Sequence, residues 1–174
     1  MENNLDKIFS FISNEEVRKK LNESEHRIRK SFDQQFAGYS LKAEDVLNET
    51  IRLNEPYNGI VEVRDINFYT FCEHHFAPFF GTANVYYQPN EIITGLGKIV
   101  RLVSDVHARR LQIQEIMTKQ IAEDIMRVLN AKGVYVETSA KHLCICSRGP
   151  SDDTATTTVT YAMGTLESWY LTKR

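Results

Sequence analysis

The order of strand-like and helix-like segments between residues 59 and 163 limits the folds open to this chain. The strand-like segments are rich in β-branched and aromatic residues, and the helix-like segments repeat apolar residues every three or four positions. In chain order they are 59–71 (strand), 79–88 (strand), 98–106 (helix), 113–129 (helix), 134–138 (strand), 142–147 (strand) and 154–163 (strand). This order predicts an α+β fold, in which an antiparallel sheet carries two helices on one face.

The first 55 residues have a different pattern and are expected to form a helical arm. Ile28, Phe32 and Phe36 recur every four residues and would line one face of a helix. A further helix is expected over residues 43–53. The sequence therefore predicts an N-terminal helical arm over residues 1–55 and one structural unit over residues 56–174. The arm would pack on that unit or on another subunit.

Composition excludes several classes of protein. The 174 residues contain 21 Lys and Arg against 23 Asp and Glu, a net charge of −2, which argues against a nucleic-acid-binding coat. No apolar run approaches the roughly 20 residues that span a bilayer, and the polar N-terminus does not fit a secretion signal. The chain has three cysteines, an odd number, so a framework built only of disulfides would leave one cysteine unpaired. We therefore expect a reduced, cytoplasmic protein whose cysteines are buried, reactive or metal-bound.

Two short segments concentrate cysteine and histidine. Residues 72–75 read CEHH and residues 142–146 read HLCIC. Thiolates together with imidazoles are what zinc prefers. Cys72 and His75 are three residues apart, so one tight turn can direct both at a single ion. In a strand over 142–147, alternate residues would share one face. Together the segments predict a metal site.

Spacing alone does not fix which of these residues bind the metal. A structural zinc site uses four protein ligands, whereas a catalytic site uses three and leaves one position for water. Water bound there has its pKa lowered to near 7. The remaining histidines would then act as acid–base groups beside the ion. The plainer alternative, small buried cysteines and ordinary histidines, also stays open.

Five segments together resemble the GTP cyclohydrolase I family. They are ESEHRI (23–28), FCEHHFAPFFG (71–81), TGLGKIVRLV (94–103), RRLQIQEIMTKQIA (109–122) and HLCICSRG (142–149). The resemblance implies the tunnelling fold (T-fold), a homodecamer of two pentameric rings, and active sites at subunit contacts. It also implies the conversion of GTP and water to formate and 7,8-dihydroneopterin triphosphate, at the entry to folate or pterin synthesis.

The same resemblance implies roles for individual residues. It assigns metal binding to Cys72, His75 and Cys144, acid–base catalysis to His74 and His142, guanine recognition to Gln114 and Glu115, binding of the triphosphate end to Lys98, Arg101 and Arg148, and a contribution to a neighbouring subunit's site to Arg27. The metal would be zinc, although thiolate and imidazole also hold iron. A glutamate carboxylate suits guanine because it accepts from both N1–H and the 2-amino group, whereas adenine presents no such pair of donors.

Several departures from the family pattern keep alternatives open, among them a C-terminal tail that is shorter than usual. Gly97 stands where the family usually has serine, and Asp152 and Asp153 follow the segment with Arg148. Cys146 is an additional thiol near the expected metal. One alternative is a divergent paralogue that acts on a related guanine nucleotide or stops at the ring-opened formamidopyrimidine. Another is a non-catalytic zinc-binding module in which Cys146 supplies a fourth ligand.

Overall fold

The computed structural model of the chain describes residues 9–172, and the chain divides into two compact units, Met1–Phe36 and Ala37–Arg174. Residues 37–55, which the sequence prediction placed in the arm, are part of the second unit. Within the described residues, no helix is long and apolar enough to cross a lipid bilayer.

The described part of the N-terminal unit, residues 9–36, contains the helices α2 (Glu15–Glu23) and α3 (Glu25–Gln35). The side chain of Asn14 caps α2 by accepting a hydrogen bond from the backbone N–H of Val17 at 3.2 Å, the arrangement that favours asparagine at a helix start. The rings of Phe32 and Phe36, one helical turn apart, have centroids 6.0 Å from each other. Arg27 lies on α3 and is exposed.

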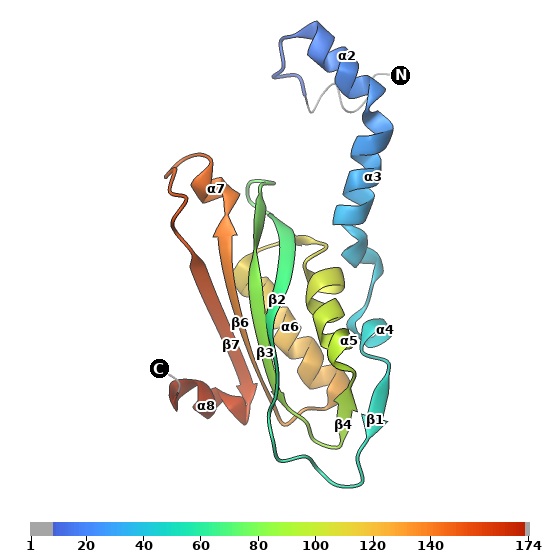
Figure 1. The fold of residues 1–174 in the computed structure, drawn as a ribbon, viewed down its shortest axis with the longest axis vertical. Coiled ribbons are helices and arrows are strands. Elements are labelled where there is room, and N and C mark those ends of the chain that lie inside the picture. The colour runs from blue at the N-terminus through green and yellow to red at the C-terminus, as the bar shows by residue number, and fades with distance from the viewer. Residues whose placement is uncertain (1–8, 173–174) are drawn as a thin grey trace. The chain divides into compact units, whose positions relative to one another are not determined.

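A five-stranded sheet forms the centre of the second unit (Figure 1). Its strands, in spatial order, are β5 (Leu111–Gln112), β2 (Val61–Cys72), β3 (Pro78–Gln88), β6 (Gly133–His142) and β7 (Thr157–Gly164). All neighbouring pairs are antiparallel except β2 with the two-residue β5. A separate two-stranded sheet pairs β1 (Thr50–Arg52) with β4 (Ile92–Thr94). The predicted antiparallel sheet is confirmed.

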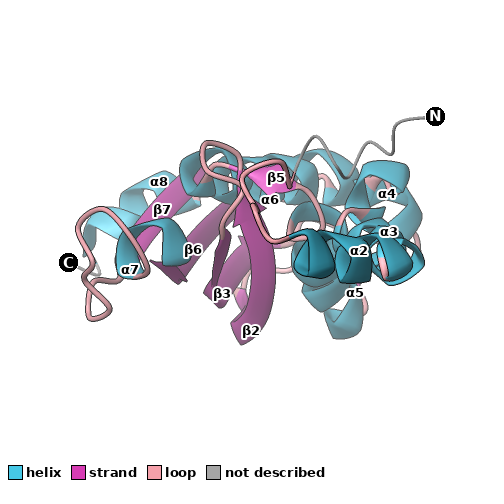
Figure 2. Ribbon diagram, turned by 90° about the horizontal axis from the view of Figure 1, so that it is seen from above, coloured by secondary structure: helices cyan, strands magenta, loops and turns pink. Residues whose placement is uncertain are grey.

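The two predicted helices cover one face of this sheet (Figure 2). α5 (Leu96–Arg101) continues into a π-helical turn, η2 (Leu102–His107), and α6 (Gln114–Leu129) packs on β6 and β7. Alternate residues of each strand meet the helices, as the period of two requires; on β6 these are Val134, Val136, Thr138 and Ala140. α6 ends at Asn130, which takes the left-handed conformation (φ 48°) common after a helix.

Two predicted elements were wrong. The expected helix over 43–53 is a single turn, α4 (Ala43–Val46), followed by β1. The expected strand over 142–147 is the last residue of β6 followed by a helical turn, α7 (Leu143–Cys146). The reason is the neighbouring strand, because the ladder between β3 and β6 ends at the pair Phe79 and His142. β3 begins at Pro78, which has no N–H to extend the ladder.

The other face of the sheet is covered at one end by α8 (Leu166–Thr172). Trp169 on α8 lies against Tyr86 and Tyr135, with ring centroids 5.3 and 5.6 Å away. Both tyrosines point away from the main core because they alternate with its residues along β3 and β6. This small aromatic cluster fixes the C-terminal helix to the sheet.

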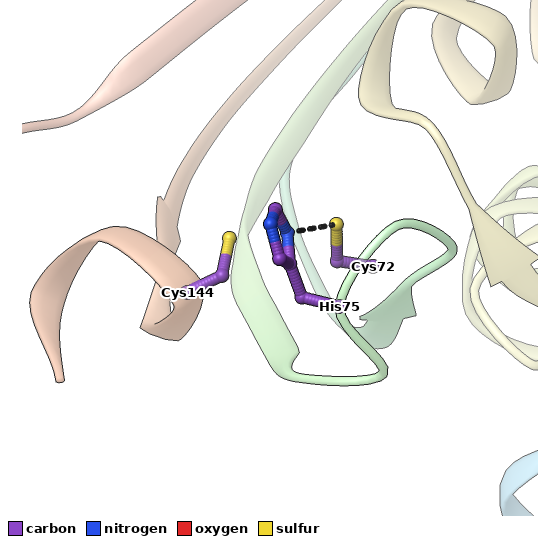
Figure 3. A group of neighbouring side chains, drawn as sticks. All are labelled: Cys72, His75 and Cys144. Atoms are coloured by element: carbon purple, nitrogen blue, oxygen red, sulfur yellow. Dashed lines mark hydrogen bonds between the residues drawn. The ribbon is translucent and has the colours of Figure 1, made fainter. Parts of the chain in front are cut away.

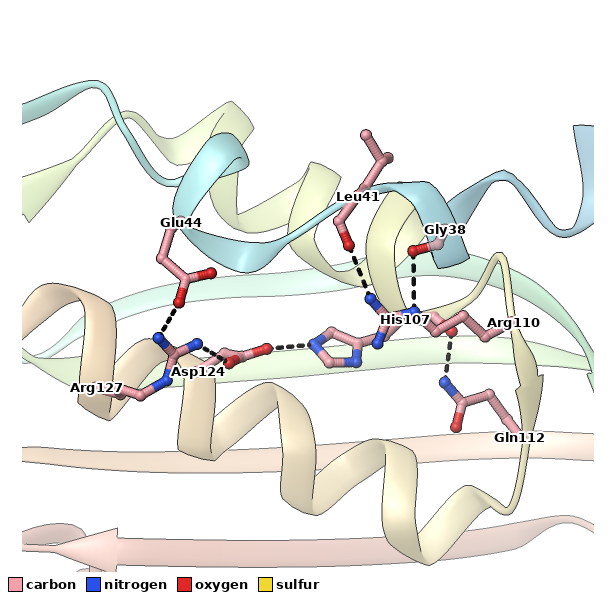
Figure 4. A network of polar contacts seen from close by, with 8 residues as sticks. All are labelled: Gly38, Leu41, Glu44, His107, Arg110, Gln112, Asp124 and Arg127. Atoms are coloured by element: carbon pink, nitrogen blue, oxygen red, sulfur yellow. Dashed lines mark hydrogen bonds and ion pairs between the residues drawn. The ribbon is translucent and has the colours of Figure 1, made fainter.

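A buried histidine connects the helices at the side of α6 (Figure 4). His107, at the end of η2, is 1% exposed, and its Nε2 lies 3.1 Å from a carboxylate oxygen of Asp124 on α6. Arg127 contacts both Asp124 and Glu44, and thereby links α6 to α4. Among the described residues, no partner reaches Nδ1 of His107. Asp124 is therefore the side chain that satisfies this ring.

Replacing Asp124 with alanine is expected to lower the free energy of unfolding by about 1–3 kcal/mol, since a buried polar group loses its partner. Denaturant titration measures this change. The neighbouring variant Glu123→Ala is the matched control, because Glu123 makes an exposed ion pair with Lys119, and its loss should change stability by less than about 0.5 kcal/mol. Equal effects of the two substitutions would remove the structural role given to Asp124.

The same residue predicts how stability depends on pH. Burial raises the pKa of Asp124, but hydrogen bonds from His107 and Arg127 outweigh it, so that the pKa falls below its ordinary value of 3.8. A carboxyl whose pKa is lowered by folding stabilises the native state above the pKa of the unfolded chain and loses that contribution as pH falls through the folded value. The difference between wild type and Asp124→Ala should therefore shrink below about pH 4.

Candidate metal centre and active site

The three side chains to which the resemblance assigns metal binding meet at one end of the sheet (Figure 3). The ligand atoms of Cys72, His75 and Cys144 all lie within 4.8 Å of one another, and the Cys72 sulfur is 3.7 Å from Nδ1 of His75. Both cysteines are buried, whereas His75 is exposed. Two thiols and an imidazole at such distances match the donor set of zinc sites with three protein ligands.

The first two of these residues lie on the turn between β2 and β3, as their spacing predicted. Cys72 ends β2, and its backbone closes the turn with two hydrogen bonds, from its N–H to the Ala77 carbonyl and from the Phe76 N–H to its own carbonyl, both 2.8 Å. Phe76 takes a positive φ of 51°, which lets the chain reverse within these few residues. The turn therefore holds Cys72 and His75 side by side.

The third residue comes from the first turn of α7. Cys144 is buried, and Cys146 lies two residues later on the same helical turn. Successive helical residues are rotated by about 100°, so Cys146 projects from nearly the opposite side of α7. Among the described residues, the group that can share an ion contains Cys144 and excludes Cys146. The prediction that His142, Cys144 and Cys146 share a strand face was wrong for this reason.

Electrostatics at the cluster favour a bound cation. Burial raises the pKa of the Cys144 thiol, and the adjacent Cys72 raises it further, while Arg148 acts in the opposite direction. Two thiols this close do not both ionise without a compensating positive charge. The chemistry of the donor set therefore fits a soft divalent metal.

A cavity of about 360 Å³ lies beside these ligands, within the usual range of ligand sites. It is lined by the three candidate ligands, by His74 and His142, and by residues 112–115, which join β5 to α6. The segments come from distant parts of the chain. They meet because β2, β5 and β6 finish at the same end of the sheet. The structure thus brings together seven of the eleven predicted site residues.

The two predicted acid–base histidines have different surroundings. His74 lies on the exposed turn next to His75, with the ring centroids 6.2 Å apart. His142 is partly buried and stacks on Phe79 at a centroid distance of 4.3 Å and an interplanar angle of 7°. Burial lowers the pKa of His142, and the carboxylate of Glu115 partly opposes this. His142 is therefore held in one position, close to an acidic group.

The two residues matched to guanine recognition open α6 but differ in exposure. Glu115 is exposed, lines the cavity and lies in the first helical turn, where the helix dipole favours a negative charge. Gln114 is only 2% exposed, and its Oε1 lies 2.7 Å from Nε2 of His142. Its amide nitrogen contacts Thr138 and Thr157. Gln114 is therefore occupied within the protein, whereas Glu115 is exposed and lines the cavity.

The basic residues matched to the triphosphate do not line this cavity. Lys98 on α5 pairs with Glu49 at 3.1 Å, Arg101 is exposed on the same helix, and Arg27 belongs to the N-terminal unit. Arg148 follows α7 and is exposed, close enough to influence Cys144 electrostatically. The cavity of one chain therefore holds the metal and base side of the predicted site without the phosphate side.

The acidic pair after Arg148 has a local structural role. One carboxylate oxygen of Asp152 accepts three hydrogen bonds, from the N–H and hydroxyl of Thr154 and from the N–H of Ala155, at 2.7–3.2 Å. The hydrogen bonds from Thr154 are the main reason that the pKa of Asp152 is lowered. The Asp153 carbonyl accepts from Lys141 at 2.8 Å. Both residues thus shape the loop between α7 and β7.

Sequence reasoning missed three residues around the cavity. Gln112 is buried and donates to the His107 carbonyl at 2.7 Å, while Thr138 and Thr157 supply acceptors for Gln114. These contacts join residues 5 to 43 positions apart. Only the Q-x-Q spacing before Glu115 gave a local signal of polar side chains on one face.

Comparison with known proteins agrees with this geometry. The sequence model of the GTP cyclohydrolase I family matches residues 1–172. GTP cyclohydrolase 1 of Campylobacter jejuni (strain RM1221) is 43% identical over 157 residues, which cover 90% of this chain and 82% of that protein. GTP cyclohydrolase 1 of Allorhizobium ampelinum is 40% identical over 167 residues, covering 96% and 83%.

A solved structure supports the fold. The archaeosine synthase QueF-Like, in its apo form, superposes with a TM-score of 0.50 over 60% of this chain and 93% of that chain, at 13% sequence identity. The chain therefore has the T-fold that the resemblance implied. The match of the family model and the identity to these relatives extend over nearly the whole sequence. This chain belongs to the GTP cyclohydrolase I family and is an enzyme of that type.

Proposed function

We propose that this protein uses zinc to open the imidazole ring of GTP at C8, and that it releases formate and forms 7,8-dihydroneopterin triphosphate. The single observation that carries the proposal is the cluster of Cys72, His75 and Cys144, whose ligand atoms lie within 4.8 Å of one another at the edge of a cavity. The three free cysteines fit the reduced, cytoplasmic setting expected from the sequence.

Cys72, His75 and Cys144 would hold the metal, with zinc as the first choice and iron(II) as the other ion that this donor set accepts. A zinc ion with three protein ligands supplies Lewis acidity and lowers the pKa of water to near 7. Cys146 lies outside the cluster, so a structural zinc site, which needs four protein ligands, would lack its fourth ligand. The arrangement therefore supports catalysis over a purely structural role.

The two histidines at the cavity would move protons during ring opening. Both line the same cavity as the metal ligands. His142 would transfer protons to or from the attacking water, because its ring is held in place by Phe79 and Gln114. His74, next to His75, would protonate N7 of the purine as the ring opens.

Glu115 would recognise guanine, because this residue lines the cavity and a carboxylate can accept from N1–H and the 2-amino group together. Replacing Glu115 with glutamine puts an NH₂ group in place of one acceptor oxygen. We expect kcat/KM for GTP to fall on the order of 10–100-fold and selectivity over ATP to shrink, with zinc content unchanged.

Steady-state kinetics with GTP and ATP measures both effects. Glu123→Gln is the matched control, because Glu123 lies two turns further along α6 and pairs with exposed Lys119. The control should behave as wild type. Unchanged selectivity in Glu115→Gln would refute the role proposed for Glu115.

The phosphate side of the site would be completed by neighbouring subunits. Lys98, Arg101 and Arg27 lie outside the cavity lining of a single chain, and Arg148 would approach the triphosphate from the loop after α7. Active sites at subunit contacts, in a homodecamer of two pentameric rings, would account for this placement. Analytical ultracentrifugation should then give a particle of ten 20.1 kDa chains, and a monomer would contradict the shared site.

Gly97 allows the phosphate side to be tested by a gain of function. A Cβ at this position meets no atom within 4 Å, so a serine fits without displacing its surroundings. If the triphosphate binds here, Gly97→Ser adds one hydroxyl contact and should lower KM for GTP several-fold, the effect of about 1 kcal/mol. Gly95→Ser, just before the helix, is a nearby control. A raised or unchanged KM in Gly97→Ser would place the triphosphate elsewhere.

Incubation with GTP tests the whole proposal. Protein reconstituted with zinc, and in parallel with iron(II), is mixed with GTP while formate and the absorbance of the pterin product are followed together. Stoichiometric formate and pterin are expected. A ring-opened purine without pterin would favour the divergent paralogue instead, and the absence of any reaction with either metal would overturn the proposed activity.

A further inference from the structure

We infer that Gln114 is a positioning residue that holds the proton of neutral His142 on Nε2 and so keeps Nδ1 as the unprotonated nitrogen. The importance of this for catalysis rests on the proposed function. The tautomer itself depends only on the contacts around the two side chains.

The orientation of the Gln114 amide is fixed by its surroundings. Its nitrogen Nε2 lies 3.2 Å from the Thr138 carbonyl oxygen and 3.1 Å from the Thr157 carbonyl oxygen. Backbone carbonyls accept hydrogen bonds and cannot donate them. The group that faces them must therefore be the NH₂ end of the amide. The reversed orientation would place the amide oxygen against the two carbonyl oxygens, with no hydrogen between them.

The hydroxyl groups nearby agree with this orientation. Thr118 lies 2.7 Å from the Gln114 backbone carbonyl, to which its single O–H donates. The Thr138 hydroxyl, 2.7 Å from the Thr118 oxygen, must then donate its own hydrogen to Thr118. Its remaining lone pairs accept from Nε2 of Gln114 at 3.1 Å. Every buried donor in this chain of contacts thus has an acceptor.

The orientation of Gln114 in turn determines the tautomer of His142. With NH₂ directed at the two carbonyls, Oε1 is the end that lies 2.7 Å from Nε2 of His142. An amide oxygen only accepts, so Nε2 must carry the hydrogen. Stacking on Phe79, at 4.3 Å and nearly parallel, keeps the ring plane in this position. The neutral ring therefore presents Nδ1 as its basic nitrogen.

This assignment also separates the two residues that open α6. Both N–H groups of the Gln114 amide are engaged inside the protein, and its side chain is 2% exposed. Neither is left to donate to a purine. Gln114 therefore acts on His142, and recognition of guanine falls to the carboxylate of Glu115.

Nitrogen NMR of the five histidines measures the tautomer directly. The zinc-loaded protein is labelled with ¹⁵N-histidine, and the His142 signals are assigned by their loss in His142→Asn. We expect a protonated-type signal for Nε2 and an unprotonated-type signal for Nδ1. Nδ1 protonated in the neutral ring of the wild type would overturn the inference, whatever the variants do.

Gln114→Met keeps a similar side-chain volume but removes the amide oxygen that accepts from His142. The Nε2–H form of His142 should then give way to a mixture with the Nδ1–H form. Gln112→Met is the matched control, because it makes the same change at the same cavity without touching His142. Thr138→Val is a second control, because it removes the hydroxyl that accepts from the Gln114 amide but leaves the carbonyls of residues 138 and 157 in place. Both controls should keep the Nε2–H signal, and an unchanged tautomer in Gln114→Met would refute the role of Gln114.

Kinetics supplies a second readout. Loss of the correct tautomer should lower kcat for GTP on the order of 10–100-fold in Gln114→Met, with KM changed far less. An unchanged kcat together with a changed tautomer would show that the tautomer does not matter for turnover, which contradicts the positioning role. If wild type shows Nε2–H but does not act on GTP, the proposed function fails while the assigned tautomer stands.

Discussion

Replacing Cys144 with serine is expected to release zinc and abolish formate production from GTP. A serine hydroxyl is a far poorer zinc ligand than a thiolate, and a site with three protein ligands cannot spare one. Loss of even an outer contact to a metal ligand costs roughly 10–100-fold in affinity, so loss of the ligand itself should cost more. Zinc content after dialysis, measured beside the rate of formate release, gives the result.

Cys146→Ser is the matched control for this experiment. It makes the same chemical change two residues away, at a thiol that lies outside the metal-binding group. It should keep one zinc per chain and the wild-type rate. If Cys146→Ser released the metal and Cys144→Ser retained it, the open three-ligand site would be wrong and the structural-zinc alternative would be favoured.

Replacing His142 with alanine is expected to leave zinc bound and to lower kcat by about 10²–10⁴-fold, the usual contribution of a positioned acid–base group. The expectation follows from the structure, because His142 lines the cavity but is not among the residues whose ligand atoms cluster. Metal analysis and single-turnover formate release, measured on the same preparation, separate binding of the metal from chemistry.

Either of two outcomes would contradict this role. Loss of zinc in His142→Ala would show that the histidine is a ligand. A normal rate with zinc retained would show that it transfers no essential proton. His107→Ala is not a suitable control because His107 is buried in the contact with Asp124, so the metal content of the variant itself serves as the internal control.

The sequence was informative wherever a pattern is local. The alternating strand at 61–72 and the four-residue repeat in 114–129 identify β2 and α6 because each shows which of its faces is buried. The CEHH turn was predicted for the same reason, since Cys72 and His75 are only three residues apart and come together through the turn alone.

Prediction failed where distant contacts decide the structure. Residues 142–147 have the composition of a strand, yet β6 ends at His142, which pairs with Phe79, because the next residue of β3 is Pro78 and has no N–H to extend the ladder. Residues 50–52 form β1 because β4, some forty positions away, supplies the partner strand. The contacts of Gln114 were likewise not visible, since its acceptors on Thr138 and Thr157 are 24 and 43 residues away.

The basic residues are the part of the site that one chain does not bring together. Lys98 and Arg101 belong to α5, whereas the cavity lies at the ends of β2, β5 and β6. The resemblance assigns phosphate binding to these residues, and the proposed sharing of the site between subunits would bring them to it. Particle size and the Gly97→Ser variant test this side without changing the metal ligands.

X-ray absorption at the zinc edge of the fully loaded protein tests the central claim most directly. We predict one zinc per chain with two sulfur neighbours, one imidazole and one further light atom that no side chain supplies. Three sulfur neighbours would show that Cys146 closes the site. A protein that binds no metal after reconstitution would contradict the proposed chemistry altogether.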